Sequence, residues 1–442
     1  MGCALPRHAV RRHRGAPRLV DVAKAAEAVA RASYGKLVAY LAARTRDLAG
    51  AEDALSDAFA AALTDWPQSG IPRTPEAWLL TVARRKLVDA VRRRRVSEDA
   101  RPTLELLGDE LGGADREPEI PDERLRLMFA CAHPAIDTAV RAPLILQAVL
   151  GLDAATIASA FLVAPSTMSQ RLVRAKSRIR EAGIPFRIPE RDELADRLSA
   201  VLEAIYAIYA EGWSDPSGTQ ARSGGLAEEG VWLGRLVTSL LPDEPEALGL
   251  LALMLHAEAR RDARRDPQGK FVPLDAQNPH LWDAQLIEEG ETLLLAASRS
   301  GVPGRFQLEA AVQSAHAARR MTGRTDWNAI VELYDALLAL TGSVVVALNR
   351  AVAVAARDGG AAGAANGLVA LDALLNDPRL SEYQPYWAAR AWLLARAGRT
   401  PEAAEAYERA IGLESDPAVR GFLQAELAQL QTARSANLSQ RG

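Results

Sequence analysis

The stretch LDAATIASAFLVAPSTMSQRLVRAKSRIR, residues 152–180, predicts two short helices separated by only a few residues. The first should cover roughly 153–161 and the second roughly 165–180. Pro165 suits the first turn of the second helix, because the N–H that proline lacks is not needed there. The apolar residues of this second helix recur at helical spacing and are expected to face inward: Met168, Leu172, Ala175 and Ile179. The pattern therefore predicts a helical hairpin.

The opposite side of the second helix carries short hydrogen-bonding groups and guanidiniums, without a bulky apolar residue. These residues are Ser166, Gln170, Arg174 and Ser177, with Arg171 and Arg178 on the flanks. Such a face suits entry into the major groove of DNA, where arginine and small polar side chains contact base edges and phosphates. The alternative is an ordinary amphipathic hairpin with a solvated outer side. The hairpin alone favours neither.

A second basic stretch, VARRKLVDAVRRRRV at residues 82–96, crowds seven basic residues against one acid: Arg84, Arg85, Lys86, Arg92, Arg93, Arg94 and Arg95 against Asp89. One side of this predicted helix is apolar, with Leu80, Ala83, Leu87 and Val91. The other side carries Arg85, Asp89 and Arg92, with Trp78 beside them. An aromatic ring among arginines can stack on an unpaired base. The alternatives are a solvated helix face and a tryptophan that packs beneath the start of its own helix.

The composition indicates an all-α protein. Of the 442 residues, 49% are hydrophobic and 25% are charged, a composition typical of a globular protein. Only 5% are aromatic, whereas alanine is abundant, and this favours closely packed helices. The two cysteines, Cys3 and Cys131, belong to no CxxC pair, so neither a disulfide framework nor a metal site is expected, and we expect no cofactor. No apolar run approaches the length of a membrane span. These features predict a cytoplasmic protein without a membrane partner.

Changes in composition divide the chain into five parts. Residues 1–20 form a basic tail, expected to be disordered, and 21–96 a helical module with one break, at DWPQSGIPRTPEAW (65–78). Residues 97–121 form an acidic linker, 122–186 a second helical module that contains the hairpin, and 187–442 a large helical C-terminal region.

Taken together, the basic helix, the acidic tether and the hairpin resemble a bacterial alternative sigma factor of the extracytoplasmic-function type, a promoter-recognition subunit of RNA polymerase. Residues 33–96 resemble sigma region 2, and residues 123–182 resemble sigma region 4 with its helix-turn-helix. Both modules occur in the order of that family. The resemblance implies core RNA polymerase and promoter DNA as partners. It also gives the acidic linker a path through the interior of polymerase, although a solvated spacer is the plain alternative.

The resemblance also implies roles for individual residues. In the family the positions of four residues dock on core polymerase: Glu52, Asp53, Asp57 and Phe59. The helix that approaches the minus-10 element carries Arg84, Arg85, Lys86, Asp89 and Arg92, with Trp78 at its start, and the loop at 65–76 matches the one that traps an extruded base. Ser166, Thr167, Gln170, Arg171 and Arg174 match positions that face the minus-35 element.

Three positions depart from the family pattern. Family members commonly carry Asn where this chain has Arg85, Gln where it has Ser56, and Gly where it has Leu162. The glycine of the hairpin turn usually permits a positive φ, which leucine resists. The promoter sequence therefore cannot be transferred from other members.

The C-terminal region resembles the tetratricopeptide-like extension that one group of these sigma factors carries. YWAARAWLLARAGRTPEAAEAYERAIGLESDP, residues 386–417, fits one repeat, with Trp387, Ala391, Gly398, Ala403, Tyr407 and Ala410 at the expected offsets. Residues 343–375 resemble a degenerate second unit with an enlarged turn. Because one repeat cannot bury its own face, further helical pairs are expected between about 190 and 341.

The densest polar segment of this region, HAEARRDARRDPQGKFVPLDAQNPHLWD, predicts a regulatory or docking surface for an unidentified protein or small-molecule signal. The residues proposed for it are Arg260, Arg261, Asp262, Arg264, Arg265, Asp266 and Trp282. The alternative is a solvated loop with ordinary salt bridges.

No catalytic residue is predicted. The histidines at 133, 256, 280 and 316 are scattered, and the chain has no HExxH, no phosphate-binding glycine loop and no nucleophile motif. The sequence favours a sigma factor that is regulated in cis by its C-terminal region. A stand-alone helix-turn-helix regulator with a partner-binding domain is the alternative, and a scaffold that merely retains sigma-like modules is a third.

Overall fold

The computed structural model is all-α over the residues it describes, which are 19–93, 122–161, 163–214 and 226–439. This part holds nineteen α-helices and a single isolated bridge, between Arg265 and Phe271, in place of any strand. The predicted fold class is therefore confirmed. The acidic linker and all but the last residues of the basic tail lie outside the described residues. The chain divides into two compact units, Met1–Ala204 and Ile205–Gly442.

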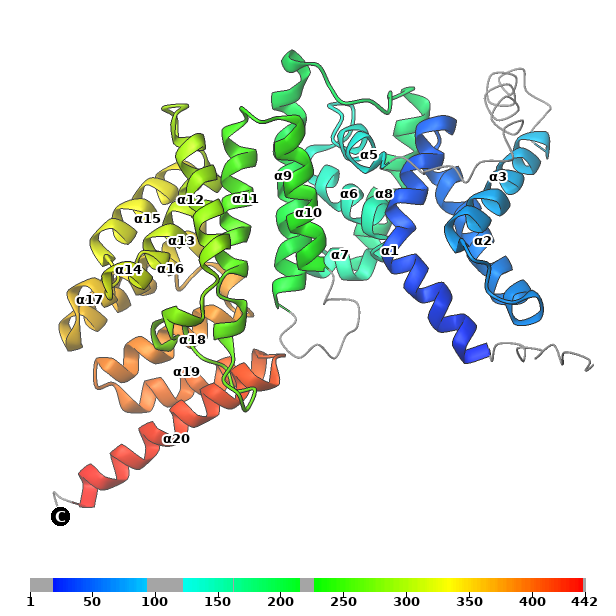
Figure 1. Ribbon diagram of the computed structural model, residues 1–442. Coiled ribbons are helices and arrows are strands. Elements are labelled where there is room, and N and C mark those ends of the chain that lie inside the picture. Colours follow the sequence, from blue (N-terminus) through cyan, green and yellow to red (C-terminus); the bar gives the residue numbers. More distant parts are fainter. Residues whose placement is uncertain (1–18, 94–121, 162, 215–225, 440–442) are drawn as a thin grey trace, which may run out of the picture. The chain divides into compact units, whose positions relative to one another are not determined.

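The first unit begins with three helices that all contact one another: α1 (Leu19–Thr45), α2 (Leu48–Ser69) and α3 (Pro75–Arg93) (Figure 1). Their contacting faces bury large apolar side chains, among them Leu37, Leu41, Leu55, Trp66 and Leu79. The apolar side predicted for the arginine-rich helix is confirmed for Leu80, Ala83 and Leu87, which are buried in α3.

The sequence predicted one break in this bundle, and the described residues have two. The expected break lies at 70–74, but Pro67 is inside α2, which continues to Ser69. The second break is at Arg46, which adopts a left-handed φ of 54° between α1 and α2. Asp47 then caps α2, because its side chain accepts a hydrogen bond from the Gly50 N–H. A single αL residue followed by an N-cap leaves no glycine or proline signal in the sequence.

Four further helices complete most of the first unit: α5 (Arg124–Cys131), α6 (Thr138–Leu150), α7 (Ala154–Ala160) and α8 (Pro165–Glu181). The last two match the predicted hairpin, and Met168, Leu172, Ala175 and Ile179 are all buried, as predicted. Helix α1 packs on α5 and α6. The approach is closest at Gly35, where an added Cβ would lie 1.9 Å from the carbonyl oxygen of Val149.

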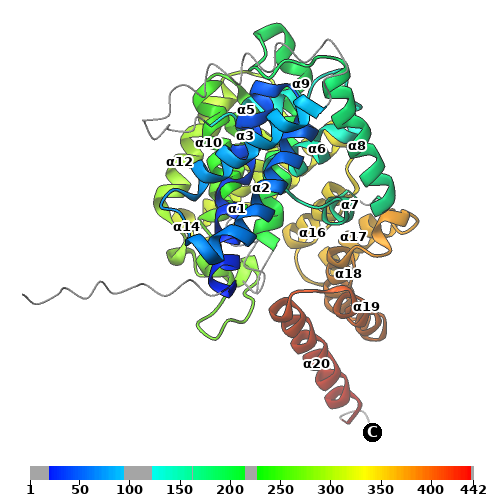
Figure 2. The same ribbon diagram turned by 90° about the vertical axis from the view of Figure 1, so that its right-hand side faces the viewer.

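Helix α9 (Arg191–Ser214) contains the boundary between the units, and the second unit continues with eleven more helices. They are α10 (Leu226–Leu240), α11 (Pro245–Glu258), α12 (Ala284–Ser298), α13 (Arg305–Ala317), α14 (Arg319–Thr322), α15 (Trp327–Thr341), α16 (Val344–Asp358), α17 (Gly360–Asp372), α18 (Gln384–Arg396), α19 (Thr400–Leu413) and α20 (Pro417–Ser439). From α15 onward each helix packs on the next, and Figure 2 shows α16 to α20 following one another.

The two helical pairs predicted near the C-terminus are α16 with α17 and α18 with α19. They share one apolar core that includes Ala351, Leu368, Ala391, Ala403 and Tyr407. The prediction of an enlarged turn in the first pair is wrong. Only Gly359 separates α16 from α17, and Gly359 and Gly360 both have positive φ, 69° and 57°, so two glycines make a tight turn where a longer loop was expected.

The described residues contain neither a candidate membrane span nor a candidate metal site. None of their helices combines the length and the apolar character that crossing a bilayer demands. In the same ranges, no group of three or more His, Cys, Asp and Glu side chains could hold a metal ion.

Candidate functional site

Helix α3 presents the predicted minus-10 residues in different environments. The Arg84 guanidinium bonds the Tyr40 hydroxyl and lies 5.2 Å from the centre of that ring, and Lys86 pairs with Asp57 at 3.6 Å. Arg85 and Asp89 are exposed. Arg92 belongs to the last turn of α3, but its side chain lies outside the description. Among the basic side chains of α3 that the structure describes, Arg85 is therefore the one that most plainly faces solvent.

Trp78 is partly buried at the start of α3. Its ring meets the buried ring of Trp66 edge to face, with centroids 5.5 Å apart. Aromatic pairs prefer this geometry, because the edge of one ring carries positive charge and the face of the other negative charge. Trp78 thus packs beneath its own helix and still keeps part of its surface in solvent.

Helix α2 carries the residues predicted to contact core polymerase. Asp53 and Asp57 are exposed and Phe59 is partly exposed, but the Glu52 carboxylate pairs with Lys176 of α8 at 2.5 Å. Burial raises the pKa of Glu52, and the neighbouring Lys176 opposes this shift. In this arrangement the Glu52 carboxylate is already paired with a lysine of α8.

A second ion pair joins the same two helices. Arg180 of α8 lies 3.8 Å from Asp47, the residue that caps α2. The two modules that the sequence separates by an acidic linker therefore pack against each other through charged as well as apolar contacts.

The outer face of α8 is open to solvent. Ser166, Thr167, Gln170 and Arg174 are exposed and Arg171 is partly exposed. The face is less uniformly polar than the pattern indicated, because Val173 is 62% exposed. Leu162, at the turn of the hairpin, lies outside the described residues, so the geometry of that turn stays a prediction.

In the second unit, the residues predicted for a regulatory surface mostly contact neighbouring groups. Arg261 pairs with Glu258, and Arg265 pairs with Asp416 at 3.1 Å. Arg264 donates to the Trp213 carbonyl at 3.0 Å and lies 4.3 Å from the centre of the Trp213 ring.

The other members of the set differ widely in exposure. Asp262 is exposed, and Asp266 accepts backbone hydrogen bonds from Gln268 and Lys270. Arg260 is partly buried, and Trp282 is buried, with 2% of its surface exposed. Exposed charge in this set is thus concentrated at Arg261 and Asp262, whereas Asp266 is partly exposed.

Sequence reasoning missed the partners that hold these side chains. Tyr40 lies 44 residues from Arg84, and Lys176 lies 124 residues from Glu52. No local pattern signals a contact over such a distance. Only Lys176 carried a sequence signal for its contact: it is a cation between Ala175 and Ser177, at the margin of the buried face of α8.

The sigma-70 region 2 family matches residues 29–96, and a family of unknown function, DUF6596, matches residues 197–298. An uncharacterized protein of Rhizobium meliloti (strain 1021) is 40% identical over 407 residues, which cover 90% of this chain and 93% of the relative. No solved structure matches the chain. The helices α1 to α3 therefore carry a sigma-70 region 2 domain.

Proposed function

We propose that this chain is an alternative sigma factor of the extracytoplasmic-function type. The proposal starts from two findings: the chain belongs to one family with its uncharacterized Rhizobium meliloti relative, and it carries a sigma-70 region 2 domain. Sigma-70 region 2 indicates a role in transcription initiation, with core RNA polymerase and promoter DNA as partners. The observation that carries the proposal is the basic helix α3 inside the region 2 match, with the α7–α8 hairpin following it in the chain.

In this proposal α3 holds the melted minus-10 strand. Arg85 provides a free guanidinium for phosphate or base, and the partly exposed Trp78 offers a ring at the start of the helix. The overall charge of −3 does not oppose this role, because affinity for nucleic acid follows the local neutralisation of phosphates.

The second helix of the hairpin, α8, then reads the minus-35 element. Its buried side fixes the helix in the module, and its exposed side offers Ser166, Thr167, Gln170 and Arg174 to a major groove. An arginine on such a face either reads guanine through two hydrogen bonds or grips phosphate. The helical pairs of the second unit regulate the activity in cis.

Polymerase binding adds one requirement. The Glu52 position faces core polymerase in the family, and here Lys176 occupies its carboxylate. The pair between α2 and α8 must therefore break when α2 meets polymerase. The arrangement of the free chain is a closed one in this proposal, and polymerase selects an open one.

Co-elution with core RNA polymerase on gel filtration tests the proposal. The full chain should co-elute, and Asp53→Arg on the exposed side of α2 should weaken the complex at least tenfold because it reverses a charge at the interface. Asp243→Arg, at another exposed aspartate, in the second unit, is the matched control and should bind normally. If the full chain fails to bind a polymerase that accepts another sigma factor, the proposal is wrong.

A stand-alone DNA-binding regulator is the second candidate, favoured by the exposure of the α8 polar face without polymerase. Such a regulator binds its operator unaided, in a sequence-specific and salt-sensitive way, whereas a free sigma factor binds duplex DNA weakly. A selection for bound sequences with the purified chain alone separates the two. An enriched motif whose binding Arg174→Ala abolishes would favour the regulator.

A further inference from the structure

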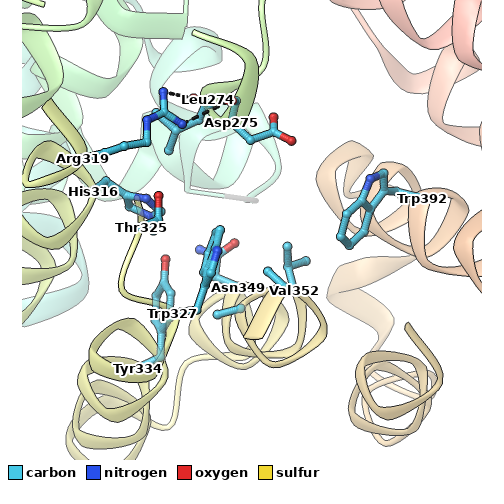
Figure 3. A pocket seen from close by; sticks show the side chains of 12 residues that line it. Leu274, Asp275, His316, Arg319, Thr325, Trp327, Tyr334, Asn349, Val352 and Trp392 are labelled. Carbon is cyan, nitrogen blue, oxygen red and sulfur yellow. Dashed lines mark hydrogen bonds between the residues drawn. The ribbon is translucent and has the colours of Figure 1, made fainter. Parts of the chain in front are cut away.

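The second unit contains a cavity of about 320 Å³ that no role proposed so far uses (Figure 3). Its walls come from the loop at 274–275, from α13 to α16 and from α18. This volume is far larger than the space of about 10–15 Å³ that a single water needs. That size suits a small molecule, at the lower end of the range for ligand pockets.

One part of the wall is apolar and aromatic. Trp327 of α15 and Trp392 of α18 contribute large rings, and α16 contributes Val352, Ala353 and Ala356. Indole rings give a flat ligand a large contact area at a low cost in side-chain entropy. These surfaces favour a ligand with a planar apolar body.

Hydrogen-bonding groups converge on the same space. Figure 3 shows the Tyr334 hydroxyl, the Thr325 hydroxyl and the Asn349 amide directed toward it, with His316 nearby. Among the described residues, no hydrogen bond uses the side chain of Tyr334, Thr325 or Asn349. Asn349 is exposed, so the cavity communicates with solvent beside it. Unused donors around an aromatic hollow are typical of a ligand site.

Two arginines lie at the cavity, Arg319 in its lining and Arg260 next to it, while the Glu309 carboxylate also acts on Tyr334. Arg319 donates to the carbonyl oxygens of Asp275, Leu274 and Gln277, at 3.1, 3.0 and 2.7 Å, which fixes the loop but does not neutralise the charge. Arg260 lies behind the wall, where it donates to the His256 carbonyl at 3.3 Å and to Gln313. None of the ion pairs in the described ranges includes either arginine. Asp275 contributes the one carboxylate of the lining.

Burial is the main cause of the pKa shifts of two neighbouring groups, and nearby positive charge adds to it at His316. Burial, and next the charges of Arg260 and Arg319, hold the pKa of His316 at about 4, so the imidazole is neutral at physiological pH. Burial also lowers the pKa of Arg260, to about 10. A negative group on a ligand would relieve this accumulation of positive charge.

We propose that this cavity is a binding site for a small organic anion with a flat aromatic body, of the aromatic carboxylate class. The ring system lies against Trp327 and Trp392, and the carboxylate accepts hydrogen bonds from the Tyr334 and Thr325 hydroxyls under the field of Arg319 and Arg260. The inference does not depend on polymerase binding. It gives the second unit a chemical signal to which it can respond.

Titration calorimetry of the full chain with 2-naphthoate tests the proposal, with 2-naphthamide as the uncharged isostere. The carboxylate should bind at one site and at least tenfold more tightly than the amide, because only the carboxylate carries the charge that the arginines favour. Raising the salt from 50 to 500 mM should weaken the carboxylate and leave the amide unchanged. Equal affinity for the two probes, or no heat with naphthoate at millimolar concentration, would overturn the inference.

Two variants localise the binding. Val352→Glu puts a carboxylate into the cavity and should weaken 2-naphthoate at least tenfold, whereas Val369→Glu, on a residue of α17 that is 73% exposed, should bind as the parent chain does. Tyr334→Phe removes only a hydroxyl and should weaken the carboxylate several-fold with the circular dichroism unchanged, which guards against a variant that fails to fold. Full affinity in both Val352→Glu and Tyr334→Phe would place the site elsewhere and refute the proposal.

Discussion

Lys176 and Glu52 form an ion pair that is largely withdrawn from water, with 15% and 12% of the two side chains exposed. One carboxylate oxygen, Oε1 of Glu52, is buried without a hydrogen-bond partner. Desolvation of this kind offsets much of the attraction between two charges. The pair therefore matters less for its own energy than for the charge that stays behind when one partner is removed.

Replacing Lys176 with Met should lower the free energy of unfolding of the full chain by about 3 kcal/mol at pH 7.5. The loss should shrink at acid pH. Glu52 has a raised pKa in the folded state, so between its unfolded value of 4.5 and that raised value the native state binds more protons, and stability falls as the pH rises through this window. Urea unfolding at several pH values measures it. The double variant Lys176→Met/Glu52→Gln should recover most of the stability. If neither acid pH nor the second substitution reduces the loss, an unpaired Glu52 charge is not its cause.

His316 should destabilise the chain in acid. Burial first, and then Arg260 and Arg319, hold its pKa at about 4, below the ordinary value of 6.5. Between these values the unfolded state binds more protons, so stability rises with pH from about 4 to 6.5 and is lost as the pH falls. His316→Gln should remove up to about 3 kcal/mol of this dependence, seen in urea unfolding at pH 7 and 4.5. Burial also lowers the pKa of His256, so part of the pH dependence should remain in this variant. The control is His280→Gln, at an exposed histidine, which should leave the pH dependence of the unfolding free energy as it is in the parent chain.

At the scale of the helices, α1 approaches α6 closely at Gly35. An alanine at Gly35 would place its Cβ 1.9 Å from the Val149 carbonyl, and a backbone atom cannot rotate away as a side chain can. Gly35→Ala should therefore destabilise the chain by about 2 kcal/mol or more. Gly421→Ala in α20, where the new Cβ meets nothing within 4 Å, should instead stabilise by about 0.5–1 kcal/mol. Equal melting temperatures for the two variants would show that α1 and α6 do not pack as described.

Elements that follow local patterns could be predicted from the sequence. The hairpin α7–α8 and its buried face follow from a 3.6-residue period and from Pro165 in the first turn of α8. Elements decided by the backbone of one residue could not, as the positive φ of Arg46 and the continuation of α2 past Pro67 show.

Contacts between distant residues were equally out of reach. Lys176 meets Glu52 across 124 residues, and the cavity beside Trp327 and Trp392 forms only when several helices converge. The residues that matter in such places carry no sign in the sequence beyond an ordinary amphipathic pattern.

At the scale of the whole molecule, the proposed function requires the first unit to open. Lys176→Glu should repel Glu52, favour the open arrangement and raise the affinity for core RNA polymerase about fivefold, because a binding-competent state that is more populated binds more tightly. A titration of labelled chain with polymerase measures this. Lys270→Glu, at an exposed lysine of the second unit, should leave the affinity unchanged. A lower affinity in Lys176→Glu than in this control would argue that polymerase binds the closed form.

Cys131 lies at the end of α5, wholly buried where that helix packs against α1 and α6. Burial raises the pKa of its thiol, so it is inert toward alkylating reagents while it stays covered. In a chain whose Cys3 is replaced by serine, a reagent can label only the molecules whose first unit has come apart around α5. The rate at which Cys131 is alkylated, measured with and without polymerase, therefore reports how often the two modules separate.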